Sequence, residues 1–413
     1  MEVSRARCRI CGSELRHPFV DLGASPLCES FLAADECNRM EPFYPLCVYV
    51  CEHCFLVQLE EYVAPEEIFS QYAYFSSYSE SWLRHARSYV EMAVERFALG
   101  PASRVIELAS NDGYLLQYFL EKGVAVLGIE PAANVAEAAT RKGVPTEVRF
   151  FDVELARELA GAGRRADLLI GNNVLAQVPD LRGFVRGMKV VLAPTGVISL
   201  EFPHLLRLME ENQFDTIYHE HFSYFSLIAL EPFFRSEGLT IFDVEELPTH
   251  GGSLRIFARH SEDGSRPVGD GVTRLLGTER EAGLDRLETY SAFSEQVKET
   301  KRRLLDFLIR AKRSGGRIAG YGAPGKGNTL LNYCGIRTDF LDFTVDRNPY
   351  KQGRFTPGTR IPIYAPEKLR EAKPDYVLIL PWNLKDEIME QESQIREWGG
   401  RFVVPIPEVR VYP

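Results

Sequence analysis

Hydrophobic and polar positions in this chain fall into short blocks with two different spacings. From residue 103 onward, apolar runs alternate with segments whose apolar positions repeat at helical spacing. The runs predict strands at 104–109, 125–130, 147–151, 166–172 and 196–202, and the segments between them predict helices at 114–122 and 134–142. Strands separated by helices of this length indicate a parallel sheet covered on both faces, which makes the fold class α/β.

The same pattern continues on either side of this sheet. An amphipathic helix runs to about residue 97, and two strands at 239–247 and 253–259 look like an antiparallel pair that closes the sheet. A polar, glycine-rich linker at 261–271 and a long helix at 278–313 lead into a second α/β unit. That unit has predicted strands at 317–321, 340–346, 375–380 and 401–404 and a helix at 328–334. We therefore predict three domains, at 1–72, 73–265 and 266–413.

Composition narrows the class of protein. The chain has 413 residues, 45% of them hydrophobic and 26% charged, which is typical of a folded chain of two or three domains. Its net charge of −10 is a poor match for nucleic-acid binding. No apolar run is long enough for a membrane span, and the N-terminus has no signal-peptide core. We expect a cytoplasmic monomer with no nucleic-acid or membrane partner.

Cysteine is concentrated near the N-terminus, where seven of the eight cysteines lie between Cys8 and Cys54. Cys8 and Cys11 form one Cys-x-x-Cys pair, and Cys51 and Cys54 form a second one further along the chain. Four thiolates in two such knuckles can surround one Zn²⁺ tetrahedrally. Because all four positions are filled by protein, we predict a structural zinc; redox-active or buried free cysteines are the alternative.

The turn after the first strand of the parallel sheet carries polar groups suited to a cofactor. Glu107 lies in the strand, and Asn111, Asp112 and Gly113 form the turn that opens the next helix. Glu130 ends the second strand, where an acid can take both hydroxyls of a ribose. This arrangement serves either NAD or S-adenosylmethionine. The turn has one glycine instead of the NAD triplet, and Asp112 would repel a pyrophosphate, so we favour S-adenosylmethionine.

Further cofactor contacts are predicted along the same sheet edge. Asn172 and Asn173 end the fourth strand, at the level where the methionine part would lie. Asp152 is placed to reach the adenine amine. Phe151 either contacts the cofactor or packs in the core.

The densest titratable cluster of the chain follows the fifth strand. Tyr218, His219, Glu220 and His221 stand together there, and a histidine beside a carboxylate suggests a general base. A metal site built on the His-x-His pair and a purely structural histidine are the alternatives. Upstream, residues 71–82 are rich in hydroxyls and aromatic rings, which either cap a sugar or base or simply pack.

A glycine-rich stretch at 320–329 opens the second α/β unit. It resembles a P-loop up to Lys326, but Gly327 stands where the Mg²⁺-binding hydroxyl is needed. We interpret it as a Rossmann-like phosphate turn, with Asp346 at the end of the strand that follows. Its backbone N–H groups and Lys326 would bind a diphosphate.

Taken together, these motifs resemble a known family. The segments that carry the resemblance are residues 72–79, 107–113, 218–224, 250–255 and 320–328, together with the paired cysteine knuckles. The chain resembles the nucleotide-sugar C-methyltransferases of deoxysugar biosynthesis, in particular the 3-C-methyltransferases that make branched sugars such as kijanose and mycarose. The match spans nearly the whole chain.

The resemblance implies a zinc-binding N-terminal domain, a class I S-adenosylmethionine methyltransferase core and a second Rossmann-like domain that holds the nucleotide sugar. It implies a dTDP-linked 4-keto-deoxysugar as substrate, methylated at C3 through an enolate. His221 would be the base, with Glu220 beside it and Tyr218, Tyr72 and Tyr74 near the sugar. The substrate-binding residues implied in the same way are Tyr78, Gln177, Gly322, Lys326 and Asn328.

One position departs from the family pattern. Relatives usually carry histidine where this chain has Gln177. Glutamine does not titrate near neutrality, so we expect it to hydrogen-bond the sugar instead. Three other functions stay open: an O- or N-methyltransferase, an NAD-dependent sugar-nucleotide oxidoreductase or epimerase, and a zinc-ribbon interaction protein with a degenerate methyltransferase core.

Overall fold

The structure is a computed structural model and describes residues 6–69 and 75–413. The chain forms two compact units, each built from three segments. Unit 1 comprises Met1–Arg16, Cys51–Leu205 and Phe222–Asp285, and unit 2 comprises His17–Val50, Leu206–His221 and Arg286–Pro413. The three domains expected from the sequence are continuous stretches of chain, unlike these units, and they stay a prediction. None of the helices in the described part of the chain combines the length and the apolar character that crossing a membrane requires.

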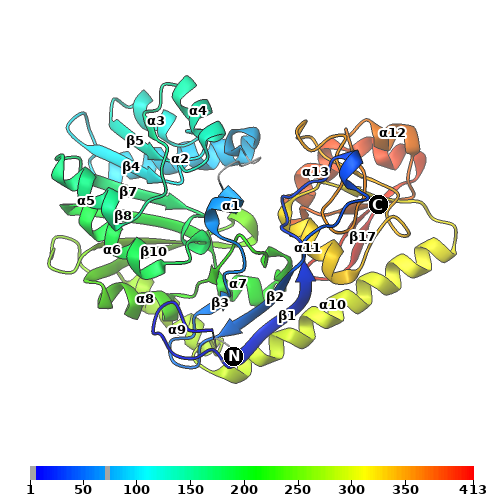
Figure 1. Ribbon diagram of the computed structural model, residues 1–413, viewed down its shortest axis with the longest axis horizontal. Helices are drawn as coiled ribbons and strands as arrows, with labels where there is room; N and C mark the ends of the chain where they lie inside the picture. The colour runs from blue at the N-terminus through cyan, green and yellow to red at the C-terminus, as the bar shows by residue number, and fades with distance from the viewer. Residues whose placement is uncertain (1–5, 70–74) are drawn as a thin grey trace. The chain divides into compact units, whose positions relative to one another are not determined.

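Unit 1 is built on a seven-stranded sheet with the order β10-β11-β8-β7-β4-β5-β6 (Figure 1). Its strands are β4 (Arg104–Leu108), β5 (Ala125–Ile129), β6 (Thr146–Glu147), β7 (Ala166–Asn172), β8 (Leu192–Pro203), β10 (Leu239–Leu247) and β11 (Ser253–His260). The five strands from β8 to β6 are parallel, and β10 and β11 add an antiparallel pair beside β8. The predicted parallel sheet and its closing pair are thus confirmed.

Helices cover both faces of this sheet because successive strand residues point to opposite sides. In β4, Val105 packs with one buried cluster and Ile106 with the other. The first cluster holds α2 (Glu80–Arg96), α3 (Leu116–Glu121) and α4 (Ala133–Arg141). The second holds α5 (Val153–Gly161), α6 (Leu181–Val191), α8 (Leu227–Ser236) and α9 (Asp270–Glu281).

Unit 2 contains a six-stranded sheet with the order β14-β13-β12-β15-β16-β17. Its strands are β12 (Ile318–Tyr321), β13 (Thr344–Val345), β14 (Ile363–Tyr364), β15 (Tyr376–Ile379), β16 (Arg401–Val404) and β17 (Arg410–Tyr412), of which only β17 is antiparallel to its neighbour. Its longer helices are α10 (Leu287–Arg313) and α11 (Gly325–Cys334), and α12 (Lys368–Ala372) and α13 (Lys385–Gln391) are short. The predicted second α/β unit is confirmed.

The segment between the two cysteine knuckles contains strands that the sequence analysis did not predict. In unit 2, β1 (His17–Ser25) pairs antiparallel with β2 (Tyr44–Val50). Phe19 of β1 stacks on Phe293 of α10, with ring centroids 4.7 Å apart. The turn-rich composition of this segment hid the alternation of buried and half-buried residues along β2, and the register shifts in the pairing of β1 with β2 interrupt it along β1.

Three predicted elements have the wrong length. The helix expected at 278–313 is two helices, because the chain between α9 and α10 turns at Gly283, whose φ is +82°. The strand expected at 147–151 ends at Glu147, and the residues after it turn away to line a cavity. The strand expected at 340–346 is only β13, since Phe340 and Leu341 donate hydrogen bonds to the Arg337 carbonyl in a turn.

Candidate functional site

The four predicted zinc ligands come together in unit 1. The sulfur atoms of Cys8, Cys11, Cys51 and Cys54 all lie within 4.8 Å of one another. Four thiolates at ~2.3 Å from a zinc ion lie about 3.8 Å apart, so this spacing fits one tetrahedral ion. Both knuckles close by the same hydrogen bond, from the residue four positions on to the carbonyl of the first cysteine.

The zinc ligands also have a polar neighbour. Gln58 is fully buried, and its amide nitrogen lies 3.3 Å from Cys8 Sγ. An N–H directed at a thiolate stabilises its negative charge and fixes its orientation. The donor set leaves no ligand position for water, so the zinc that these residues hold is structural.

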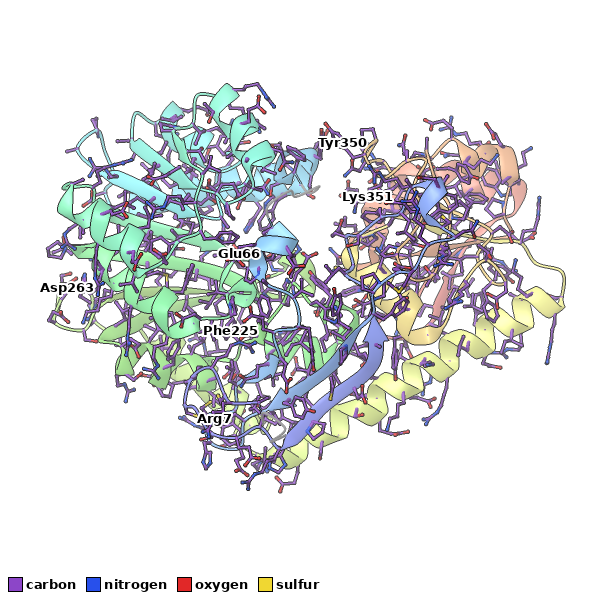
Figure 2. The ribbon with its side chains drawn as sticks, viewed as in Figure 1. Arg7, Glu66, Phe225, Asp263, Tyr350 and Lys351 are labelled. Atoms are coloured by element: carbon purple, nitrogen blue, oxygen red, sulfur yellow. The ribbon has the colours of Figure 1, made fainter. Side chains whose placement is uncertain are left out.

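A cavity of about 600 Å³ lies at the carboxyl ends of β4, β5 and β7. This is the edge of a doubly wound sheet where ligands bind, and the volume suits a small-molecule cofactor. Of the predicted cofactor residues, six line it: Asn111, Glu130, Phe151, Asp152, Asn172 and Asn173. Gln177 also lines it, as does Glu66 of α1 (Pro65–Phe69; Figure 2).

Backbone strain is concentrated on the wall of this cavity. Ala109, Asn111, Asn173 and His250 line it, and each has a positive φ between 50° and 56°. Residues other than glycine adopt this conformation at a cost of about 1–3 kcal/mol, and such residues cluster at functional sites. Gly113 continues the same turn at φ +73°, where a Cβ would lie 2.9 Å from Val144 Cγ2.

Glu130 holds the cofactor turn together. One carboxylate oxygen accepts the Asn111 N–H at 2.9 Å, and the other accepts the Ala132 N–H at 2.9 Å. Burial raises the pKa of Glu130, and these two N–H groups oppose that rise. Each oxygen keeps a second lone pair, so the carboxylate can still accept ribose hydroxyls.

Three predicted cofactor residues do not line the cavity. Glu107 is fully buried behind it, and burial raises its pKa well above the ordinary value. Asp112 pairs with Lys142 at 2.9 Å, which neutralises the charge that we expected to repel a pyrophosphate. Gly113 is the third, and its role is the tight turn itself.

The two predicted adenine-side residues, Phe151 and Asp152, both contact other parts of the protein. Phe151 packs edge-on against Phe184, with ring centroids 5.4 Å apart. Asp152 is the N-cap of α5 and accepts the Leu155 N–H at 2.7 Å. Both side chains therefore have a structural role in addition to lining the cavity.

Among the cavity-lining residues that were not predicted as site residues are Trp82, Tyr114 and His250; Trp82 ends the aromatic-rich segment 71–82. Trp82 stacks near Tyr114 at 5.9 Å between ring centroids and lies 4.9 Å from the His250 ring. His250 Nε2 is 3.2 Å from Asn173 Nδ2. The two glycines that follow His250 in the sequence are a turn signal that points to this wall, although we used them only for the family resemblance.

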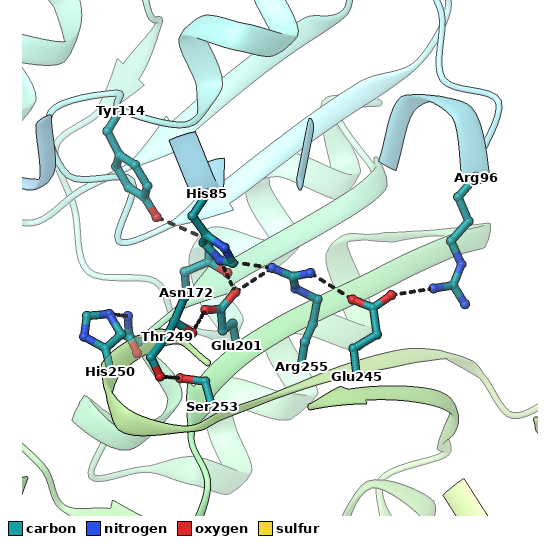
Figure 3. Close-up of polar contacts among 11 residues, drawn as sticks. His85, Arg96, Tyr114, Asn172, Glu201, Glu245, Thr249, His250, Ser253 and Arg255 are labelled. Atoms are coloured by element: carbon teal, nitrogen blue, oxygen red, sulfur yellow. Dashed lines mark hydrogen bonds and ion pairs between the residues drawn. The ribbon is translucent and has the colours of Figure 1, made fainter. Parts of the chain in front are cut away.

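Behind this wall lies a buried ionic network (Figure 3). Glu201 of β8 is fully buried and accepts hydrogen bonds from Thr249 Oγ1 at 2.8 Å and from Arg255 Nη2 at 2.6 Å, and it contacts His85 Nε2 at 2.9 Å. Arg255 also binds Glu245 at 2.9 Å. The network fixes the backbone that carries Thr249 and His250.

The predicted reactive segment lies in unit 2. His221 is buried, and its Nδ1 lies 3.1 Å from the Thr216 carbonyl. Because a carbonyl only accepts, Nδ1 carries a proton, so in the neutral form of the ring the lone pair is on Nε2. The Tyr218 ring lies 4.2 Å from the His221 ring. Glu220 accepts a hydrogen bond from the Cys28 thiol at 3.4 Å.

His219 and His221 form hydrogen bonds with different backbone carbonyls. His219 Nε2 lies 3.1 Å from the Pro45 carbonyl, and burial lowers its pKa. Among the described residues, the four cysteines form the one group with the geometry of a metal site. The metal alternative for His219 and His221 therefore has no support in this part of the chain.

Asp215, in the same segment, is fully buried. Trp382 Nε1 donates a hydrogen bond of 2.7 Å to its carboxylate. Burial raises the pKa of Asp215 to about 7, although the charge of Lys326 opposes this. The sequence analysis did not single out Asp215.

The glycine-rich turn of unit 2 is closely packed by protein. A Cβ at Gly322, Gly325 or Gly327 would lie 2.6 Å from Pro381, 2.9 Å from Cys28 or 2.9 Å from Leu380, respectively. These glycines therefore have a packing role. Binding of a diphosphate by this turn stays a prediction.

Carboxylate side chains also contact the backbone of this turn. Asp346 accepts the Ala323 N–H at 2.7 Å, and the Glu29 carboxylate lies beside Gly325. Lys351 pairs with Glu29 at 3.1 Å (Figure 2). An anion that bound at the start of α11 would have to displace Glu29.

The remaining predicted substrate residues differ in their surroundings. Lys326 Nζ donates to Asn383 at 2.9 Å, and the buried Asn328 donates to the Cys28 carbonyl at 2.6 Å. Tyr78 is exposed and does not line the cavity. Tyr72 and Tyr74 lie outside the described residues.

The fold, the cavity and the cysteine cluster define an S-adenosylmethionine-dependent methyltransferase with a structural zinc. Three family models match the chain: a putative zinc binding domain at residues 8–69, a methyltransferase domain at 82–244 and a C-methyltransferase C-terminal domain at 248–407. The C-methyltransferase NovU of Streptomyces niveus is 38% identical over 404 residues, which cover 98% of this chain and 96% of the relative. The chain therefore belongs to the C-methyltransferase family.

Solved structures overlap a smaller part of the chain. A magnesium protoporphyrin IX methyltransferase of Synechocystis is 15% identical, covers 43% of this chain and 79% of its own, and has a TM-score of 0.34. A methyltransferase of Anabaena variabilis is 15% identical, covers 42% of this chain and 83% of its own, and also has a TM-score of 0.34. Membership of the C-methyltransferase family rests on the near full-length relative. It decides against the oxidoreductase, the O- or N-methyltransferase and the interaction protein.

Proposed function

We propose that this C-methyltransferase methylates C3 of a dTDP-linked 4-keto-deoxysugar, in deoxysugar biosynthesis, with His221 as the base. The observation that carries the proposal is the hydrogen bond between His221 Nδ1 and the Thr216 carbonyl. This bond keeps the lone pair of the neutral imidazole on Nε2, which is the atom that would accept a proton.

The chemistry of the substrate supports a base of this kind. A ketone at C4 acidifies the hydrogen on C3, so one histidine can remove that proton and leave an enolate. When bound, S-adenosylmethionine supplies an electrophilic methyl group, which the C3 carbon takes up as the sulfonium becomes a neutral thioether. The proton stays on His221 and then passes to solvent.

We assign supporting roles to the groups beside the base. Tyr218 covers the His221 ring and would keep water from the imidazole. Glu220 is held by the Cys28 thiol, and its charge would stabilise the imidazolium that forms. Tyr72, Tyr74 and Tyr78 are proposed sugar contacts, and Gln177 on the cavity wall would hydrogen-bond the sugar.

Unit 2 is proposed to bind the nucleotide part of the substrate. Lys326 is its best candidate for a phosphate contact, because it follows Gly325 in the glycine-rich turn; its ammonium would have to leave Asn383 to bind a phosphate. Gly322 and Asn328 would act by shaping that turn.

Hydrogen exchange at the sugar tests the proposal directly. The enzyme is incubated with dTDP-4-keto-6-deoxy sugars in D₂O, with and without S-adenosylmethionine, and products are analysed by mass and NMR. We expect deuterium at C3 without the cofactor and a methyl group at C3 with it. His221→Ala should abolish both while S-adenosylmethionine binding, measured by calorimetry, stays near that of the wild type.

A neighbouring histidine provides the matched control. His219→Gln keeps a donor for the Pro45 carbonyl and should leave exchange intact. Exchange that survives in His221→Ala, or a methyl group found only on oxygen or nitrogen, would contradict the base assignment.

A further inference from the structure

A short pair of strands in unit 1 joins the zinc knuckles to the chain that follows residues 218–221. Strand β3 (Val57–Leu59) begins shortly after the second knuckle, and β9 (Ser223–Tyr224) begins two positions after His221. The two strands pair antiparallel, with Gln58 opposite Ser223. The knuckle therefore determines where the chain runs as it leaves His221.

Phe222, the residue bonded to His221, is held from both sides. Its N–H donates to the Ala176 carbonyl at 2.7 Å, and its carbonyl accepts the Leu59 N–H at 2.9 Å. A third bond comes from Arg9, whose Nη1 donates to the same carbonyl at 3.0 Å. Phe222 is 1% exposed, so these bonds are shielded from water.

Arg9 is itself set by the zinc site. It stands between Cys8 and Cys11, and its N–H donates to Gln58 Oε1 at 2.9 Å. The other end of the Gln58 amide donates to Cys8 Sγ at 3.3 Å. The guanidinium lies 5.5 Å from the centroid of the Phe222 ring. Closure of the first knuckle around a metal thus aims Arg9 at Phe222.

We propose that Arg9 is a positioning residue for the reaction, through which the zinc site fixes the peptide that follows the base. A charged donor on a buried carbonyl makes a strong hydrogen bond. A displacement of a reacting group by about 1 Å costs about 100-fold in rate. The zinc site would then contribute to turnover as well as to stability. This inference rests on the proposed role of His221.

A second arginine allows the positioning role to be separated from a merely structural one. Arg182 Nη2 donates to the carbonyl of Ile10 at 2.6 Å, so it supports the same knuckle. Its other partners are Glu237 and the Phe233 ring. Removing Arg182 therefore removes one contact to the knuckle, while the hydrogen bonds to the Phe222 carbonyl stay in place.

The experiment compares Arg9→Met, Arg9→Lys and Arg182→Met with the wild type. For each protein we would measure zinc per chain, thermal stability, the S-adenosylmethionine dissociation constant and the rate of deuterium exchange at C3. We expect Arg9→Met to retain zinc and cofactor affinity but to exchange roughly 10–100-fold more slowly, with kcat reduced and KM for the cofactor unchanged. Arg9→Lys should recover part of the rate, because an ammonium can donate to the same carbonyl. Arg182→Met should exchange at the wild-type rate.

The outcomes separate the proposed function from the positioning role of Arg9. No exchange in the wild type would refute the proposed function, whereas wild-type exchange with an equal rate in Arg9→Met would refute only the positioning role. An equal loss in Arg182→Met would also refute it. If Arg9→Met loses zinc or unfolds, Arg9→Gln decides, because its shorter, uncharged side chain stays polar but lacks the charged donor: a slower rate with full zinc supports the role, and the wild-type rate overturns it.

Discussion

The buried network around Glu201 gives the sharpest stability prediction. We expect Arg255→Met to destabilise unit 1 strongly, because it removes the cation that pairs with a fully buried carboxylate. Glu201 would then keep its contact with His85 and its hydrogen bond from Thr249. A buried charge that has lost its main partner is costly, whereas an apolar pair of similar size is not.

The magnitude follows from the pKa of Glu201. Burial alone would raise this pKa, but the hydrogen bond from His85 and the charge of Arg255 lower it from 4.5 to about 2. At 1.36 kcal/mol per pKa unit, the partners of Glu201 together contribute about 3 kcal/mol. Removing one partner of a buried ion pair costs about 3–5 kcal/mol, so we expect a loss of about 3 kcal/mol in Arg255→Met. The pKa is lower in the folded state, so this stability is fully present above pH 4.5 and is lost as the pH falls toward 2.

Thermal unfolding checks the prediction. For a unit of this size, about 3 kcal/mol corresponds to a fall in Tm of roughly 6–12 °C at pH 7. The control is Arg96→Met at the partly exposed end of the same network, where Arg96 binds Glu245 and Asp243. An ion pair at the surface contributes about 1 kcal/mol or less, so this control should melt within a few degrees of the wild type.

A double variant tests the physical reason. Glu201→Leu combined with Arg255→Met removes both charges, so it should recover at least half of the stability lost in Arg255→Met. A Tm for Arg255→Met within about 1 °C of the wild type would refute the reasoning. A double variant less stable than the single one would show that the cost comes from packing and not from the charge.

Three further predictions concern the zinc, the cofactor turn and the buried acid of unit 2. Cys51→Ser should lower both the zinc content, measured by mass spectrometry, and the Tm; a fully stable, zinc-free and active variant would contradict a structural zinc. Glu130→Gln should weaken S-adenosylmethionine binding by about tenfold in calorimetry, since an amide has one oxygen to replace two that hold the turn. The folded pKa of Asp215 is raised from 3.8 to about 7, so the wild type should lose stability as the pH rises from about 4 to 7, and Asp215→Asn should remove this dependence in Tm measurements between pH 5 and 8.

The sequence predicted best those parts of the fold that depend on local pattern. β7, β10 and β16 have the predicted limits. For β7 and β16 the reason is that buried strands of a parallel sheet are continuous apolar runs. The predicted zinc ligands do come together, because two Cys-x-x-Cys pairs supply the four thiolates that one zinc ion needs. Elements whose limits depend on tertiary contacts, such as β6 and β13, were predicted too long.

The cofactor site was predicted only in part, for a physical reason. The residues at strand ends, such as Glu130 and Asn172, follow from topology and line the cavity. Trp82 and His250 come from segments far apart in the sequence and meet through packing, which no local pattern encodes. In the same way, Asp112 was expected to repel a pyrophosphate, whereas Lys142, from a different element, neutralises its charge.

The two units share one structural device that explains why an acid ends the second strand in each. In unit 1, Glu130 accepts the N–H of Asn111 from the first turn and the N–H two positions further on. In unit 2, Asp346 accepts the N–H of Ala323 from the first turn at 2.7 Å, and that of Asn348 two positions on at 2.8 Å. Such a carboxylate fixes the turn even without a ligand. An acid at this position is therefore weak evidence for a nucleotide by itself. A cavity beside the acid is the stronger evidence for a bound ligand. Unit 1 has a cavity there, whereas the turn of unit 2 is packed against Cys28, Leu380 and Pro381.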